Sequence, residues 1–310
     1  MRYEVVAIGN PVYDIIVTPS AKSRGRILSG CSINALLALR KLGFSRLGLV
    51  GSIGRDYLER LRTDLRRYGI NEFVLIIGNE TGGFELVYNT KGDRTLKVLG
   101  VAGRIEENDI PDEYLNAEYI LLGPILQEID IKVVEYLATT SKAKLFLDPQ
   151  GLLRIIDEQG MIRRVCDRDI LKKIASMVDY IKPNEHESKV LTGEDNPYLA
   201  AKKMVDWGAR IGIVTLAERG SVAYDGDVFY RVQAYKTNAI DPTGAGDVYA
   251  GAFIAKKLEG APLPEAMLFA SAAASVMVEH IGPDFPLSYE EARKRYIAII
   301  DTLEITDRLN

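Results

Sequence analysis

The segment from Asp241 to Asp247, with the sequence Asp-Pro-Thr-Gly-Ala-Gly-Asp, has the residue types of an anion-binding turn. Residues 248–258 repeat apolar side chains at helical spacing, so the glycines of this segment lie at the start of a predicted helix. The first N–H groups of a helix have no intrahelical acceptor, and the helix dipole adds about half a positive charge there. Gly244, Ala245 and Gly246 let an anion approach the backbone closely, so the segment predicts a phosphate-binding site.

Asp247 follows these glycines directly, and a carboxylate at this position has two interpretations. It can cap the first turn of the helix, or it can take the proton of a hydroxyl group that attacks the bound anion. Phosphoryl transfer depends on positioning and charge neutralisation, so a carboxylate of ordinary acidity suffices as the base. The chain has no Walker A pattern and no Gly-x-Gly-x-x-Gly after its first predicted strand, which argues against a P-loop enzyme and a dinucleotide oxidoreductase.

The elements that must position this segment alternate between short apolar runs and longer stretches of helical period. Such alternation is typical of β-α-β units and of a parallel sheet covered by helices on both faces. Three further helices are expected after residue 248, separated by prolines. The predicted strands are residues 4–8, 47–50, 119–122, 144–147, 178–181 and 211–216, and the predicted helices between them include 32–42, 57–68, 129–138 and 199–207.

Two segments, at about residues 12–28 and 83–98, break this rhythm and have the period of two that is typical of strands, with turn residues. We expect them to form a small accessory sheet that acts as a lid and excludes water from a site. The alternative is an antiparallel extension of the sheet edge without a lid role. No linker or internal repeat is visible, so residues 1–310 are predicted to form one domain.

The composition, with 47% hydrophobic and 26% charged residues, is typical of soluble globular proteins. The 39 basic and 43 acidic side chains are interspersed and give a net charge of −4, which argues against a nucleic acid partner. No apolar run approaches the roughly 20 residues that span a bilayer, and the first residues do not resemble a signal peptide, so we expect no membrane partner and a cytoplasmic location. Two cysteines and two histidines are too few for a disulfide framework, a four-cysteine zinc site or a His-rich metal site.

The string from Asp241 to Asp247 is similar to the second signature of the ribokinase-like (PfkB) family of carbohydrate and nucleoside kinases. Other segments resemble further motifs of this family and follow one another in the family's order, so the resemblance covers nearly the whole chain. These segments are Gly9 to Asp14, Gly30 to Gly43, Val50 to Asp56, Lys182 to Glu187 and Val214 to Gly220.

The resemblance implies a ribokinase-like three-layer α/β/α domain with a central, mostly parallel sheet and a small β lid. It also implies that Asp247 is the general base and that the backbone of Gly244, Ala245 and Gly246 forms the anion hole for the transferred phosphoryl group. The residues implied to hold the acceptor molecule are Asp14, Gly30 and Asn34.

The same resemblance implies Mg²⁺ as cofactor and ATP as co-substrate, with Glu187 organising the metal through water. K⁺ would be a further cofactor if this member uses a monovalent cation. The chain departs from the family at Ala217, where the nucleotide loop frequently has glycine. The residues implied to bind the nucleotide are Asn184, Thr215 and Gly220, and those implied to lie near a monovalent cation are Asp241 and Thr243.

The implied activity is transfer of the γ-phosphate of ATP to an alcohol group of a small sugar, polyol or nucleoside. Sugar-phosphate kinase is an alternative, because Arg24, Arg26 and Arg94 could reach a phosphate, although the favoured interpretation of these arginines is solvated charges at the lid edge. Phe84 and Tyr88 could stack on the acceptor or simply pack. A non-catalytic binding protein is disfavoured, since base and anion-hole residues are all present.

The interval between Asp14 and Gly30 is shorter than in ribokinase itself, which puts the family's lid-to-lid dimer in doubt. A monomer and a homodimer both remain open.

Overall fold

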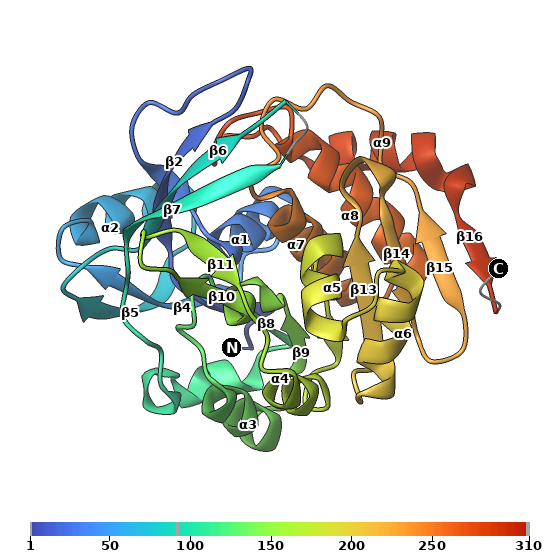
Figure 1. Cartoon of the computed structure of the whole chain (residues 1–310), viewed down its shortest axis with the longest axis horizontal. Helices are drawn as coiled ribbons and strands as arrows, with labels where there is room; N and C mark the ends of the chain where they lie inside the picture. The colour runs from blue at the N-terminus through green and yellow to red at the C-terminus, as the bar shows by residue number, and fades with distance from the viewer. Residues whose placement is uncertain (1, 91–92, 308–310) are drawn as a thin grey trace.

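The computed structural model describes residues 2–90 and 93–307 and is built around a ten-stranded sheet in the order β16-β15-β14-β13-β12-β9-β8-β1-β4-β5 (Figure 1). Neighbouring strands from β13 to β5 are parallel, whereas β14, β15 and β16 continue the sheet in antiparallel order. The strands are β1 (Val5–Ile8), β4 (Leu47–Gly54), β5 (Glu72–Gly78), β8 (Tyr119–Leu122), β9 (Lys144–Leu147), β12 (Tyr180–Ile181), β13 (Ile211–Thr215), β14 (Ser221–Tyr224), β15 (Phe229–Val232) and β16 (Glu304–Thr306).

Helices cover both faces of this sheet, as the alternation in the sequence predicts. In β1, Val5 and Ala7 belong to one apolar cluster and Val6 and Ile8 to another, because successive strand residues point to opposite faces. The first cluster includes α1 (Cys31–Lys41), α2 (Leu58–Arg67), α7 (Ala245–Leu258), α8 (Leu263–Met277) and α9 (Tyr289–Ile299). The second includes α3 (Ile131–Thr140), α4 (Arg168–Ala175), α5 (Glu185–Thr192) and α6 (Pro197–Asp206).

The two segments with strand period form one separate sheet in the order β3-β2-β6-β7, at the upper left of Figure 1. Although β2 and β6 lie far apart in the sequence, they pair in parallel, so the sheet is not made of hairpins alone. Its inner face packs around Val12, Ile16, Phe84 and Leu86. The strands are β2 (Val12–Val17), β3 (Ile27–Ser29), β6 (Gly83–Tyr88) and β7 (Arg94–Gly100).

A further hairpin of β10 (Arg154–Ile156) and β11 (Ile162–Arg164), which the sequence did not predict, lies beside the lid. A bridge between Lys97 of β7 and Met161 joins it to the lid sheet. Among the residues described, no helix is both long and apolar enough to cross a membrane. The short 3₁₀ helices are η1 (Glu107–Asp109), η2 (Asp112–Asn116), η3 (Pro149–Leu153), η4 (Ala217–Arg219) and η5 (Ile300–Thr302).

The parallel strands bring chemistry-bearing residues to one edge of the sheet. Asp148 directly follows β9, Lys182 directly follows β12, and Thr215 ends β13. Because ligands of open α/β sheets bind outside the carboxyl ends of the strands, this edge is where the fold places a site.

Candidate active site

A cavity of about 720 Å³ lies between the lid sheet and the carboxyl ends of the parallel strands. It gathers most of the residues that the sequence singled out, from segments as far apart as the lid and α7. Asn34 and Asp241 are not on its wall but lie directly behind it, bonded to Asp247 and Thr243. The predicted residues on the wall are Asp14, Gly30, Asn184, Glu187, Thr215, Gly220, Thr243, Gly244, Ala245, Gly246 and Asp247.

Asp247 stands in the first turn of α7, and its carboxylate is held by side chains of other elements. Asn34 Nδ2 of α1 donates to Oδ2 at 2.9 Å, and Gln150 Nε2 donates to Oδ1 at 3.2 Å. Burial raises the pKa of Asp247, and the nearby Asp148 carboxylate raises it further. Burial and the Asp148 charge make this carboxylate a stronger base than an exposed one, although the hydrogen bond from Asn34 opposes this effect while it fixes the group in place.

Asp148 and Lys182 form a buried ion pair beside the anion-binding turn. Their atoms Oδ2 and Nζ are 2.9 Å apart, and both side chains are almost fully buried. Burial alone would lower the pKa of Lys182, but Asp148 holds it above its ordinary value. A Cβ atom added to Gly246 would lie 3.3 Å from Nζ, so this ammonium group is next to the turn. The Lys182 ammonium group of this pair can stabilise negative charge that develops on a phosphate bound there.

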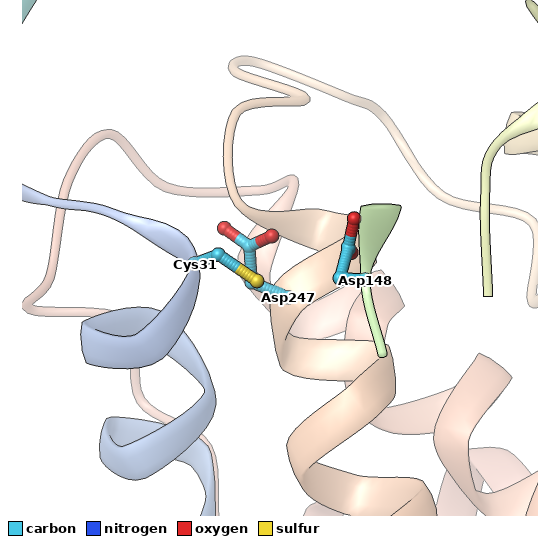
Figure 2. Close-up of side chains that lie close together, drawn as sticks. All are labelled: Cys31, Asp148 and Asp247. Carbon is cyan, nitrogen blue, oxygen red and sulfur yellow. The ribbon is translucent and has the colours of Figure 1, made fainter. Parts of the chain in front are cut away.

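Figure 2 shows Cys31, at the start of α1, facing Asp247 on α7 and Asp148 at the end of β9. One ligand atom from each of these three residues lies within 4.8 Å of the others. Burial raises the pKa of the Cys31 thiol well above its ordinary value, and the Asp247 charge adds to this. The thiol therefore stays protonated beside the Asp247 carboxylate.

Asp14 faces the same cavity from the lid strand β2. The Phe84 N–H of β6 donates to its Oδ1 at 2.7 Å. Burial raises the pKa of Asp14 to about 6, against the lowering effect of hydrogen bonds from Ser29 and Phe84. Gly30, at the N-terminus of α1, has φ 115°, and a Cβ there would lie 2.9 Å from the Asn10 carbonyl oxygen. Only glycine fits this turn without strain.

Asn184 and Glu187 form a capping box at the start of α5. Asn184 Oδ1 accepts from the Glu187 N–H at 2.9 Å, and Glu187 Oε2 accepts from the Asn184 N–H at 3.0 Å. In the neighbouring loop, Gly220 has φ 87°, and a Cβ there would meet the Val232 carbonyl oxygen at 2.0 Å. Ala217 has φ 51°, a left-handed conformation that favours glycine, which gives the family's preference at this place a physical reason.

The lid is tied to the anion-binding turn through Tyr88. Its hydroxyl lies 2.9 Å from Thr243 Oγ1, and Arg94 Nη1 donates to the same hydroxyl at 3.0 Å. Tyr88 thus makes a specific polar contact besides packing in the lid core. Asp241 is fully buried: its Oδ1 accepts from the Thr243 N–H, while its Oδ2 has no hydrogen-bond partner in the described part of the chain.

Of the three lid arginines considered for a phosphate, Arg94 lines the cavity, whereas Arg24 and Arg26 are not on its wall. Arg26 instead donates to the Tyr13 carbonyl oxygen and lies over the Tyr57 ring. The sequence assigned no role to Cys31, Asp148, Gln150 or Lys182. Asp148 and Lys182 each directly follow an apolar run that forms a parallel strand, and Lys182 also begins one of the segments that resemble a family motif.

The description "pfkB family carbohydrate kinase" belongs to the family whose model matches residues 4–289. This match spans most of the chain, so the chain belongs to the pfkB family and is a carbohydrate or nucleoside kinase of that family.

The chain is 30% identical over 272 residues to the cytidine kinase of Thermococcus kodakarensis. The aligned region covers 84% of this chain and 91% of that protein. Among solved structures, a pyrophosphate-dependent kinase of the ribokinase family complexed with a pyrophosphate analog and myo-inositol superimposes with a TM-score of 0.80. It is 22% identical, and the match covers 94% of this chain and 99% of that one. A putative ribokinase II from E. coli in complex with ATP and Mg²⁺ has a TM-score of 0.75 and 20% identity, over 96% of this chain and 99% of that one. These two structures establish the ribokinase-like fold.

Proposed function

We propose that the protein transfers the γ-phosphate of ATP to an alcohol group of a small sugar, polyol or nucleoside, with Asp247 as general base. The observation that carries this proposal is the position of the Asp247 carboxylate. It lies in the same turn as Gly244, Ala245 and Gly246 and faces the cavity that Asp14 reaches from the lid. An acceptor held by Asp14 would meet the base and the phosphate-binding turn together.

In this reaction the acceptor oxygen forms a bond to the γ-phosphorus, and the bond from that phosphorus to the β-phosphate oxygen breaks. The hydroxyl proton goes to the Asp247 carboxylate, and ADP leaves with the bonding electron pair. N–H groups at the start of α7 stabilise the charge on the transferred group. Lys182, beside Gly246, supplies a cation on the same side. Asn34, which is not on the cavity wall, acts as a positioning residue for the base, and Gln150 on the wall holds the other oxygen of the same carboxylate.

A nucleotide donor is supported by an apolar part of the cavity wall, which we assign to the base. The residues Leu216, Ala234, Tyr235, Ala274 and Val278 offer apolar and aromatic surface there. Asn184, Thr215 and Gly220 lie between this part and the anion-binding turn in our assignment, along the phosphates. Inorganic pyrophosphate would leave the apolar part unused, so ATP is the favoured donor.

The residues present fit a magnesium ion. Carboxylate and amide oxygens, the ligands that Mg²⁺ prefers, are supplied by Glu187 and Asn184 on the cavity wall. The ion would neutralise phosphate charge, held mainly through water. A monovalent cation such as K⁺ has one fitting feature, the buried Asp241 Oδ2, which has no hydrogen-bond partner in the described residues, next to Thr243.

The test is a screen for ADP release with ATP and Mg²⁺ over nucleosides, pentoses, hexoses, inositol and the monophosphates of each. We expect acceptor-dependent ADP release with one class, and release slowed on the order of 10²- to 10⁴-fold in the Asp247→Asn variant. Replacement of ATP by pyrophosphate in the same screen, read as phosphate release, tests the donor. A purified protein that binds ATP but releases no ADP with any acceptor would favour the non-catalytic alternative.

A further inference from the structure

Three arginines line the cavity beside the lid: Arg94 of β7, Arg154 of β10 and Arg164 of β11. Arg154 and Arg164 are direct cross-strand partners in the antiparallel hairpin. The bridge between Lys97 and Met161 joins this hairpin to β7, and Figure 1 shows β11 beside β7. Like charges directly opposite each other destabilise an antiparallel pair. The fold therefore gathers three guanidinium groups at a cost to its own stability.

Among the described residues, none of these three arginines forms a direct ion pair with a carboxylate. Of the cations that are buried in the described residues, Lys182, Lys256 and Arg295 each form an ion pair with a carboxylate. Arg154, which is only 4% exposed, donates to two neutral oxygens, a backbone carbonyl and a side-chain amide. Within residues 2–90 and 93–307, no carboxylate lies within 4 Å of the guanidinium nitrogens of Arg94, Arg154 or Arg164.

The electrostatic environment of Arg154 points the same way. Burial lowers the pKa of Arg154, and repulsion from Arg94 and from Arg164 lowers it further, whereas the Glu187 and Asp148 carboxylates oppose this lowering. A buried cation without a direct ion pair is costly, because hydrogen bonds to neutral oxygens replace its hydration but supply no opposite charge. The arrangement becomes favourable once an anion enters the cavity.

Arg154 lies on the acceptor side of the cavity, near the residues that hold Asp14. The Arg154 guanidinium carbon is 5.9 Å from the centroid of the Phe84 ring, and the Phe84 N–H holds Asp14. On its other side, Arg154 Nη2 donates to Gln150 Oε1 at 2.6 Å, and Gln150 in turn donates to Asp247. Arg154 is thus placed between Asp14 and the proposed base.

We propose that the acceptor already carries a phosphate group, which Arg94, Arg154 and Arg164 bind while a free hydroxyl of the same molecule faces Asp247. This inference rests on the proposed function and names its acceptor as a phosphomonoester. A dianionic phosphate offers three terminal oxygens to the planar forks of arginine, which bind it bidentately. A neutral sugar, polyol or nucleoside would leave all three cations without an anion. A carboxylate would bring only one charge.

The test compares acceptors in pairs that differ only by a phosphate: cytidine with cytidine monophosphate, ribose with ribose 5-phosphate, fructose with fructose 6-phosphate, and myo-inositol with its monophosphate. Gluconate serves as the carboxylate probe. In at least one pair the phosphorylated member should have a kcat/KM about 100-fold or more above its neutral partner, the effect of two or more charge-assisted contacts. If the neutral member equals or exceeds its partner in every pair, or if gluconate exceeds all phosphates, the inference is wrong.

Variants locate the effect. Arg164→Gln changes an exposed residue of the cavity wall, so the variant should fold normally. The ratio of kcat/KM for the phosphorylated acceptor to kcat/KM for its neutral partner should fall about tenfold or more. Arg154→Lys keeps the buried charge but removes the planar guanidinium group that binds phosphate bidentately, so it should lower the same ratio. Arg24→Gln is the matched control, because it removes an exposed lid arginine that is not on the cavity wall. If Arg164→Gln raises the KM for ATP and leaves the ratio intact, the arginines serve the donor and the inference is overturned.

Calorimetric binding in the absence of ATP separates this inference from the proposed function. If the phosphorylated acceptors bind more tightly than their neutral partners but no ADP is released, the anion site of the three arginines is supported and the kinase proposal is refuted. ADP release with neutral acceptors only, together with no preference in binding, would keep the kinase and refute the anion site.

Discussion

Asn34 Nδ2, on the first turn of α1, donates to Asp247 Oδ2, on the first turn of α7, at 2.9 Å. The two helices pack side by side on one face of the sheet, so their starts meet below the cavity. The same amide nitrogen would lie 2.8 Å from a Cβ atom added to Gly244. One amide therefore contacts both the proposed base and the anion-binding turn, and it fixes their spacing.

Asp247→Asn should leave a folded protein that binds ATP, with turnover lowered on the order of 10²- to 10⁴-fold, the usual loss for a general base. Asparagine has nearly the same shape and removes a buried charge, but its NH2 group cannot accept one of the two hydrogen bonds from Asn34 and Gln150. The two effects oppose each other, so the thermal midpoint should change little. Circular dichroism melting, ATP binding and ADP release measure the three properties. A folded variant with turnover within about threefold of the native enzyme would reduce Asp247 to a structural residue.

Gly244→Ala should impair turnover, because the new Cβ collides with the Asn34 amide that holds Asp247. Gly260→Ala is a matched control: its φ of 82° is close to the 81° of Gly244, but a Cβ there meets nothing within 4 Å. Both changes carry the cost of a left-handed alanine, about 1 kcal/mol. Unfolding in urea should show that cost in both variants, and kcat should fall only in Gly244→Ala. Equal kcat values in the two variants would contradict the contact with Asn34.

Asp14→Asn should stabilise the protein at pH 8 while it weakens acceptor binding. The folded pKa of Asp14 is about 6, above the ordinary 3.8, so the native state holds this proton more tightly than the unfolded state. Stability is therefore complete below the unfolded pKa and is lost as the pH rises through about 6, by about 3 kcal/mol in total for a shift of this size. Asparagine keeps an oxygen for the Phe84 N–H and has no such loss.

Urea unfolding of both proteins between pH 4 and pH 8 tests this expectation. The free energies of unfolding of the native protein and of Asp14→Asn should converge at the acid end. They should separate as the pH rises, with the variant the more stable of the two. A constant difference over this range would show that Asp14 does not titrate near 6.

Glu187→Gln should raise the magnesium requirement about 10- to 100-fold, as removal of a residue that orients metal-bound water typically does. Glutamine can still complete the capping box, because its side-chain oxygen accepts from the Asn184 N–H. The matched control is Glu291→Gln, which changes the corresponding third position of α9, far from the cavity. Magnesium titrations of ADP release compare them. An unchanged requirement in Glu187→Gln would assign the residue to the helix start alone.

The parallel sheet and the anion-binding turn could be predicted because short, contiguous stretches of the sequence determine both. Apolar runs of strand length identify β1, β8 and β9, and the string from Asp241 to Asp247 is contiguous. The ion pair of Asp148 and Lys182 could not be predicted from the sequence, because it depends on the register of β9 and β12, in which Ile181 lies opposite Leu147. The next residues along both strands then meet at one edge of the sheet. The arginine pair of β10 and β11 likewise exists only once that hairpin has formed.

Removal of the Lys182 charge should change the pH dependence of turnover. Asp148 raises the pKa of Asp247, and the Lys182 charge opposes this effect. Lys182→Met leaves Asp148 as an unpaired carboxylate near the base, so the pKa of Asp247 should rise. The acid limb of the kcat profile should then move to higher pH, and kcat should fall because the phosphate site has lost a cation.

Lys182→Met should also destabilise the fold by about 3 to 5 kcal/mol, the usual cost of breaking a buried ion pair from one side. The double variant Lys182→Met with Asp148→Leu removes both charges, so most of this stability should return. In the double variant the acid limb should return toward its native position, because the carboxylate that repelled Asp247 is gone, but kcat should stay low. Recovery of kcat together with stability would mean that Lys182 only supports the fold. An acid limb that does not move in Lys182→Met would mean that Asp148 and Asp247 titrate independently.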